Sequence, residues 1–200
     1  GVLGLMGVLV PTECGGSGFS YTEYVTAIEQ LSILDPSIGL SMAAHNSLCT
    51  GHILQFANEE QKKKWLPKLA SAEWIGAWGL TEHNTGSDSG SMATTAVKDG
   101  DDWVINGTKH FISNAHISDF VVLFASTGTG EQGRNLLSCF LVDLHQKGVE
   151  VAKGYDCVSH RGYVNNIIHF NDCRIPAKNI LGEKDKGFEL MNVWLEATRL

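Results

Sequence analysis

Hydrophobic side chains in the first part of the chain recur at the spacing of an α-helix. From Tyr24 to Leu34 they lie three or four positions apart, so one face of this segment is apolar. Ser20 and Glu23 form a capping box, in which a hydroxyl and a carboxylate satisfy the exposed N–H groups of a first helical turn. The pattern therefore predicts a helix that begins after Ser20.

Two further helices are predicted from the residues at their starts. Asp35 suits the N-cap position, and Pro36 suits the first position of a helix. Asn58 and Gln61 form a second capping box, and the lysines that follow match the dipole of a helix over residues 59–66. The first third of the chain is therefore expected to be helical.

Short apolar runs bounded by glycine, asparagine and aspartate replace the helical spacing after Trp74. Residues 98–102 have the composition of a hairpin turn, and Asn106-Gly107 is the dipeptide of a second tight turn. A hinge at residues 182–187 precedes a helical pattern at 188–200. The strands expected on this basis are residues 75–80, 93–97, 103–105, 109–113, 119–125, 136–142 and 166–170.

This order of elements predicts an α+β fold in three parts. Residues 1–74 are expected to form an N-terminal α-helical domain that is incomplete at its start. Residues 75–183 have the strand spacing of a small antiparallel β-barrel domain. Residues 184–200 are expected to be the first helix of a C-terminal helical bundle.

Composition narrows the possible partners. The 200 residues carry a net charge of −7 with acidic and basic residues mixed, so no basic stripe is present for nucleic acid. Charged residues make up 18% of the chain, below the roughly 25% of a typical soluble domain. We therefore expect part of the surface to be buried against other chain or other subunits.

The five cysteines are widely spaced and form no C-x-x-C pair, which is typical of reduced thiols in a cytosolic protein. The apolar start lacks the basic flank of a signal peptide, and no run reaches the roughly 18 apolar residues of a membrane span. A cytoplasmic location without membrane attachment is predicted, or the mitochondrial matrix for a eukaryotic source. A start without methionine and an end inside a helical pattern indicate a fragment.

Two segments at the ends of predicted strands carry the candidate chemistry. Thr81 and Ser87 follow the strand that contains Trp78, and Ser113 follows Phe111 in a later strand. Hydroxyls and backbone N–H groups beside large aromatic rings suit a flat cofactor with a polar rim, such as a flavin. Taken alone, the Thr-Gly-Ser-Asp segment is better explained as a turn whose side chains bond the local backbone, and only its clustering with the other residues favours a cofactor site.

Other motifs favour structural interpretations. Residues 128–133 match G-x-G-x-x-G, but a strand is predicted after them, so a hairpin loop is favoured over a dinucleotide site. His45 and His52 lie two helical turns apart with no third ligand nearby, so packed or solvated histidines are favoured over a metal site. No Ser-His-Asp arrangement or G-x-S-x-G motif is present.

The two candidate segments resemble motifs of the acyl-CoA dehydrogenase family of flavoproteins. Residues 81–88, Thr-Glu-His-Asn-Thr-Gly-Ser-Asp, are similar to T-E-P-x-A-G-S-D. Residues 107–115, Gly-Thr-Lys-His-Phe-Ile-Ser-Asn-Ala, are similar to G-x-K-x-W-I-T-N-A. Further segments resemble family motifs in the same order and at the same spacing, so the resemblance extends over essentially the whole chain. These segments are residues 9–18, 60–67, 160–162, 170–176 and 179–188.

The resemblance implies FAD, held without a covalent bond between the barrel and the C-terminal helices. The Leu80 backbone and the Thr81 hydroxyl would meet the pyrimidine edge of the flavin. Phe111 would stack near the isoalloxazine, and Ser113 would bond near N5. The cofactor-binding residues implied are Trp78, Gly79, Leu80, Thr81, Gly86, Ser87, Phe111, Ile112 and Ser113, and no metal site is implied.

The resemblance also implies α,β-dehydrogenation of an acyl-CoA thioester. A carboxylate would remove the α proton while the β hydride passes to flavin N5, and hydrogen bonds to the thioester carbonyl would stabilise the developing enolate. Ser87, Glu196 and Arg199 would contact the substrate. The family's glutamate base comes from later in the C-terminal domain or from the position of Thr198, so this chain alone is expected to lack the base and to be inactive.

Some residues depart from the family pattern. His83 replaces the usual proline after Thr-Glu. Phe111 and Ser113 replace tryptophan and threonine, but they keep an aromatic face and a hydroxyl. Residues 162–165 differ from the usual R-G-S/T sequence.

The implied partners are electron-transfer flavoprotein as electron acceptor and further copies of the chain in a homotetramer or homodimer. An acyl-CoA oxidase or a flavin monooxygenase of the same superfamily remains open, because oxygen access depends on parts of the fold outside this chain. A non-catalytic interaction module of helices and barrel, without flavin, also remains open.

Overall fold

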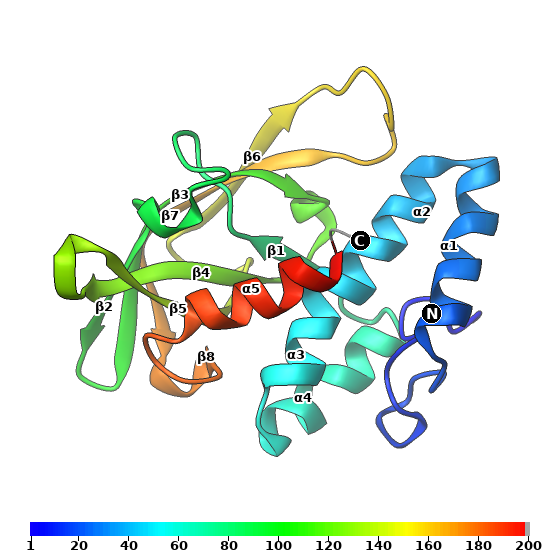
Figure 1. The fold of residues 1–200 in the computed structure, drawn as a ribbon, viewed down its shortest axis with the longest axis horizontal. Helices are drawn as coiled ribbons and strands as arrows, with labels where there is room; N and C mark the ends of the chain where they lie inside the picture. Colours follow the sequence, from blue (N-terminus) through cyan, green and yellow to red (C-terminus); the bar gives the residue numbers. More distant parts are fainter. Residues whose placement is uncertain (199–200) are drawn as a thin grey trace.

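The computed structural model describes the backbone of residues 1–198, with side chains at all of these positions except 132, 194 and 196–198. Helices gather at one end of a curled sheet, and the last helix lies across the sheet (Figure 1). The helical elements are α1 (Tyr21–Leu34), α2 (Pro36–Ala43), the π-helix η2 (Ala44–Thr50), α3 (Gly51–Phe56), α4 (Glu59–Ala70) and α5 (Gly187–Thr198), with short 3-10 helices η1 (Thr12–Cys14), η3 (Ser89–Ser91), η4 (Ala115–Ile117), η5 (Glu131–Gly133) and η6 (Ala177–Asn179).

Local capping fixes where the first helices begin. Ser20 with Glu23, and Asn58 with Gln61, form both predicted capping boxes. Asp35 caps α2 by accepting a hydrogen bond from the backbone at its start. The predicted starts of α1, α2 and α4 are therefore confirmed, whereas α4 continues about one turn beyond its predicted end.

The π-helix η2 interrupts the helix predicted to begin at Pro36. It faces the protein interior and buries both His45 and Asn46. The Asn46 side chain accepts a hydrogen bond from the Val8 backbone at 3.1 Å and donates one to the Leu5 carbonyl at 2.8 Å. The widened turn therefore anchors the N-terminal segment to the helices.

The strands form one sheet. They are β1 (Gly76–Gly79), β2 (Thr95–Asp99), β3 (Asp102–Ser113), β4 (Phe120–Thr129), β5 (Asn135–Asp143), β6 (Val149–Tyr155), β7 (Asn165–Pro176) and β8 (Ile180–Leu181). Hydrogen-bonded neighbours follow the order β6-β7-β3-β2-β4-β5-β8, and β1 pairs with β4. The glycine-rich residues 128–133 join β4 to its antiparallel neighbour β5, so the predicted hairpin loop is confirmed.

The predicted antiparallel barrel is wrong in two respects. The sheet is mixed, because β1 runs parallel to β4 and Thr95 of β2 pairs in parallel with Ser126 of β4. The sheet is also open, because β6 and β8 are edges that do not pair with each other. Within the described residues, α5 is the one helix after β8, so a C-terminal bundle is not seen.

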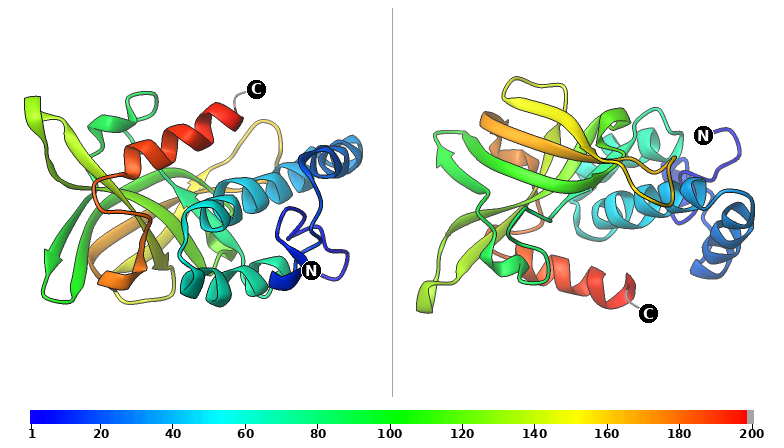
Figure 2. Two further views of the ribbon diagram at one scale, coloured as in Figure 1. Left: turned by 60° about the horizontal axis from the view of Figure 1, so that its bottom comes forward. Right: turned by 90° about the horizontal axis from the view of Figure 1, so that it is seen from above.

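The alternating side chains of β4 contribute to two cores. Phe120, Val122 and Phe124 pack with buried residues of α3, α4 and α5. Val121 and Leu123 belong to a second core on the other face of β4. The curl of the sheet is visible in Figure 2. The strand spacing from which a barrel was inferred therefore belongs to a curled sheet that does not close.

Asn106-Gly107 is not a turn. It lies inside β3, which replaces two predicted strands, at a register shift against β7. The Asn106 side chain accepts a hydrogen bond from the Asp172 backbone at 2.9 Å and donates one to the Asp172 carboxylate at 3.1 Å. Gly107 has φ +149°, and a Cβ there would lie 2.5 Å from the Thr94 hydroxyl. The dipeptide therefore supports a β-bulge.

Gly76 in β1 allows the helices to approach the sheet closely. A Cβ at this position would lie 2.1 Å from the Cys49 sulfur and 3.1 Å from the Phe120 ring. We expect Gly76→Ala to lower the free energy of unfolding by about 1–3 kcal/mol, because the packed core has no space for the methyl group. Urea unfolding measures this, with Gly128→Ala as the control, since a Cβ at Gly128 has its nearest neighbour at 3.8 Å. Equal stability of the two variants would contradict the expectation.

Across the described residues, no helix has both the length and the apolar character needed to cross a bilayer.

Candidate functional site

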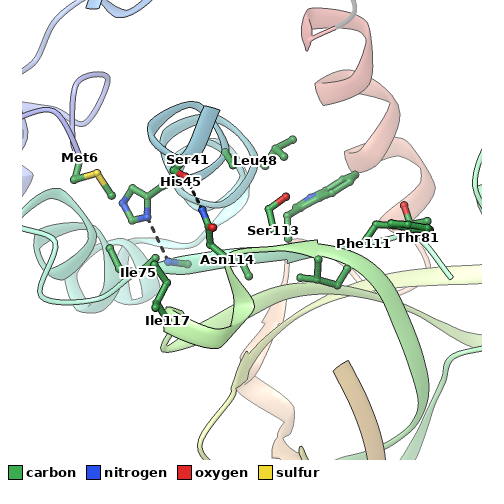
Figure 3. A pocket seen from close by; sticks show the side chains of 15 residues that line it. Met6, Ser41, His45, Leu48, Ile75, Thr81, Phe111, Ser113, Asn114 and Ile117 are labelled. Carbon is green, nitrogen blue, oxygen red and sulfur yellow. Dashed lines mark hydrogen bonds between the residues drawn. The ribbon is translucent and has the colours of Figure 1, made fainter. Parts of the chain in front are cut away.

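A cavity of about 230 Å³ lies where η2 meets the ends of β1 and β3 (Figure 3). Ala44 and Leu48 of η2 form part of its apolar wall. Thr81 and Ser113 contribute hydroxyl groups from the opposite wall, where Phe111 also lies. The cavity thus has an apolar wall and a wall that carries polar and aromatic groups.

A second hollow of about 350 Å³ adjoins the first. Trp78 and Thr81 line both, so the two spaces meet at these residues. The second hollow follows the loop at Gly86 and Ser87 and reaches Phe188 of α5. The combined site is elongated, as a long cofactor or substrate requires.

The residues predicted from the two motifs come together, with some exceptions. A backbone hydrogen bond of 2.8 Å from the His110 N–H to the Thr81 carbonyl joins the two segments. Gly79 instead lies close to Val121 and Leu123, away from both hollows. The side chain of Glu196 and the whole of Arg199 lie outside the described residues. The predicted residues that line one hollow or both are Trp78, Leu80, Thr81, Gly86, Ser87, Phe111, Ile112 and Ser113.

A buried ion pair that the sequence did not reveal holds the first segment in place. The Lys109 ammonium lies 2.8 Å from the Glu82 carboxylate, and it also donates a hydrogen bond to the Leu80 carbonyl at 2.9 Å. Glu82 accepts two more hydrogen bonds, from the backbone N–H groups of Ala93 at 2.6 Å and Thr94 at 2.9 Å. The pair therefore ties the chain on both sides of Thr81 to β3 and to the segment before β2.

The environment shifts both charged groups of this pair. Burial alone raises the pKa of Glu82, but the Lys109 ammonium and the hydrogen bonds outweigh it, so the pKa is lowered from its ordinary value. Burial lowers the pKa of Lys109, and the attraction of Glu82 opposes this shift. The charged form of Glu82 is thus the one that the site is built to hold.

The Phe111 side chain is supported from β6. Its ring stacks on that of Tyr155, with centroids 4.5 Å apart and planes 19° from parallel. Phe111 has φ +58°, which is rare for an aromatic residue, and its side chain remains 52% exposed. The backbone and the Tyr155 stack together hold an exposed ring at the mouth of the cavity, close to Thr81 (Figure 3).

His45 and Asn114 connect the helical wall to the strands (Figure 3). His45 Nδ1 accepts a hydrogen bond from the Gly76 N–H at 3.3 Å, and its Nε2 lies 3.2 Å from the Leu69 carbonyl. The Asn114 amide donates to the Ser41 hydroxyl at 2.9 Å. His45 is therefore a packed histidine, as the spacing favoured, and it holds β1 against η2.

The donor set suits a flat, conjugated molecule with polar edges. The indole N–H of Trp78 is buried and has no hydrogen-bond partner within the described part of the chain. Two hydroxyls and an exposed aromatic ring line the paired hollows beside Trp78. Among the described residues, no three His, Cys, Asp or Glu side chains are placed to hold a metal ion.

Family models match both halves of this architecture. The N-terminal domain of acyl-CoA dehydrogenase matches residues 1–73, and its middle domain matches residues 77–173. The chain belongs to the acyl-CoA dehydrogenase family. The matched regions contain both motif segments and the Glu82–Lys109 pair between them.

Individual members of the family align over nearly the whole chain. The human mitochondrial short-chain specific acyl-CoA dehydrogenase is 40% identical over 200 residues, which are 100% of this chain and 48% of that protein. Butyryl-CoA dehydrogenase from Megasphaera elsdenii superposes with a TM-score of 0.92 at 33% identity, over 97% of this chain and 51% of that one. The chain spans about half the length of the curated relatives it matches.

An acyl-CoA dehydrogenase from Bacillus anthracis, solved in complex with FAD, also superposes closely. The TM-score is 0.92 at 31% identity, over 99% of this chain and 33% of that chain.

Proposed function

We propose that the full gene product is an FAD-dependent acyl-CoA dehydrogenase that oxidises the α,β bond of an acyl-CoA thioester. The observation that carries the proposal is the convergence of Trp78, Thr81, Phe111 and Ser113 on one elongated site. Membership of the family, and the names of the relatives, support the same reaction. When bound, FAD would supply the acceptor for the hydride that leaves the β carbon.

The described side chains would bind and orient the reactants. The Leu80 backbone and the Thr81 and Ser113 hydroxyls would bond the edge of the flavin, and Phe111 would cover part of its face. The remaining members of the proposed cofactor set are Trp78, Gly79, Gly86, Ser87 and Ile112. Gly79 would act through the backbone of β1, since it lies away from both hollows.

Substrate binding is proposed at both ends of the site. The apolar wall at Ala44 and Leu48 would receive the acyl group and exclude water from the reacting carbons. Ser87, together with Glu196 and Arg199, would contact the acyl-CoA. The carboxylate that removes the α proton is proposed to come from outside these 200 residues, so the chain alone would be inactive.

The exposed apolar side chains of the first helices support a larger assembly. Val25, Ile33 and Leu34 of α1, with Ile38 of α2, are more than half exposed. Several exposed apolar side chains on two helices in contact favour a protein interface. We propose a homotetramer or homodimer, with electron-transfer flavoprotein as the acceptor, in the cytoplasm or the mitochondrial matrix. The division into domains at 1–74, 75–183 and 184–200 stays a prediction.

We expect Thr81→Ala and Ser113→Ala each to weaken FAD binding by the full gene product about five-fold, since each removes a hydrogen bond worth ~1 kcal/mol. Flavin absorbance after dialysis measures the retained cofactor. Thr95→Ala, which removes an exposed hydroxyl of β2, serves as the control and should retain FAD fully. A colourless wild-type protein that FAD cannot reconstitute would refute the proposed function.

A further inference from the structure

The segment between β6 and β7 carries a tyrosine that contacts the candidate site. The Tyr163 hydroxyl is hydrogen-bonded to the hydroxyl of Ser113 at the end of β3. This contact occurs in residues 162–165, where the sequence departs from the usual family pattern. Family resemblance therefore assigns no role to Tyr163.

The backbone around Tyr163 is fixed on both sides. The Val164 carbonyl accepts a hydrogen bond from the Asn114 N–H at 2.7 Å, and the Gly162 N–H donates to the Ser37 hydroxyl at 3.2 Å. The Tyr163 N–H donates to the His160 carbonyl at 2.8 Å. The segment is thus attached to both β3 and α2, so the phenol is held against Ser113.

The hydroxyls of Tyr163 and Ser113 differ in how readily they donate a hydrogen bond. A serine hydroxyl has one proton and two acceptor sites, whereas a phenol is the more acidic group and the better donor. Burial raises the pKa of Tyr163, while its bond to Ser113 opposes the shift, so the phenol keeps its proton at neutral pH. With Tyr163 as donor, the Ser113 oxygen accepts and its own proton remains available to the cavity.

We infer that Tyr163 is a positioning residue that fixes Ser113 as a hydrogen-bond donor toward the cavity. The inference rests on the proposed function, in which the Ser113 hydroxyl meets the flavin near N5. Oxidised flavin N5 accepts a hydrogen bond, whereas the reduced N5–H group donates one. A Ser113 hydroxyl locked as donor therefore favours the oxidised cofactor over the reduced one.

The test is the two-electron reduction potential of FAD bound to the full gene product, with Tyr163→Phe compared with wild type. Without the phenol hydroxyl, Ser113 turns freely and accepts from the reduced ring. The preference of the site for oxidised over reduced FAD should then fall about five-fold. Because a tenfold change in this preference corresponds to 29.6 mV, the reduction potential should rise by ~20 mV. The same Tyr163→Phe change in a Ser113→Ala background should leave the potential unaltered.

Tyr24→Phe is the matched control, because it removes a tyrosine hydroxyl that bonds the Ala43 carbonyl at 3.1 Å, outside the site. It should leave the potential at the wild-type value. A wild-type potential in Tyr163→Phe, or a shift that persists in the Ser113→Ala background, overturns the inference while the proposed function stands. A wild-type protein that binds no FAD overturns the proposed function, and the inference with it.

Discussion

Replacing Glu82 by glutamine should lower the free energy of unfolding by about 3–5 kcal/mol, because the Lys109 ammonium would then be buried without its counter-charge. The side chains of Lys109 and Glu82 are 0% and 6% exposed, so water cannot take over the role of the lost carboxylate. The backbone at Leu80 should loosen as well, since Lys109 also binds its carbonyl. Urea unfolding of the full gene product, followed by tryptophan fluorescence, measures the effect.

The double variant Glu82→Gln with Lys109→Met separates charge from packing. It removes both charges, and methionine fills most of the space of the lysine stem, so it should be more stable than Glu82→Gln alone. Asp156→Asn is the matched control, because its partner Lys153 lies 3.1 Å away but both side chains are mostly exposed. It should leave stability unchanged. A Glu82→Gln variant as stable as this control would refute the assigned role of the pair.

Stability should fall steeply as the pH is lowered from about 7 to about 4. Burial lowers the pKa values of both His45 and His52 to about 4, although backbone hydrogen bonds work in the opposite direction. Below the ordinary pKa of 6.5, the unfolded chain takes up protons that the folded chain excludes, so folding loses free energy. Each histidine contributes up to roughly 3 kcal/mol over this interval.

The slope of unfolding free energy against pH identifies the groups responsible. His52 lies among Phe56, Trp78 and Phe124, so His52→Phe keeps an aromatic ring while removing one titrating group. The slope between pH 4 and 6.5 should then fall by about half, whatever happens to stability at pH 7. An unaltered slope would show that His52 is not one of these groups. Protonation of Glu82 lowers the free energy of unfolding only below pH 4.5, because the pKa of Glu82 in the folded chain is lowered from its ordinary value of 4.5.

Helix starts could be read from the sequence, because a capping box involves residues within one turn of each other. Sheet topology could not, because the parallel pairing of β1 with β4 joins segments that are more than 40 positions apart. Asn106-Gly107 misled the prediction because the same dipeptide suits a turn and a bulge, and only Asp172 on the neighbouring strand decides between them. The strand β6 was missed because Glu, Lys and Gly interrupt the apolar residues of Val149–Tyr155.

The sequence predicts those residues of the candidate site that lie within short, continuous motifs. Trp78, Thr81, Phe111 and Ser113 could be proposed because each lies in or beside a short segment with a family pattern, and the structure places all four around one hollow. The partners that support them were not found. The Glu82–Lys109 pair and the Tyr163–Ser113 contact cross 27 and 50 positions respectively, and a charged or aromatic residue in isolation shows no sign of its partner.

The backbone hydrogen bond between His110 and Thr81 joins the two strand segments that border the candidate site. Under the proposed function, a bulkier acyl chain would have to break this hydrogen bond in order to separate the two segments. A movement of the helical wall away from the sheet would instead act on contacts such as that of Asn114 with Ser41 of α2. If the proposed function holds, substitutions on the helical side should therefore alter acyl-chain selectivity more than substitutions on the strand side.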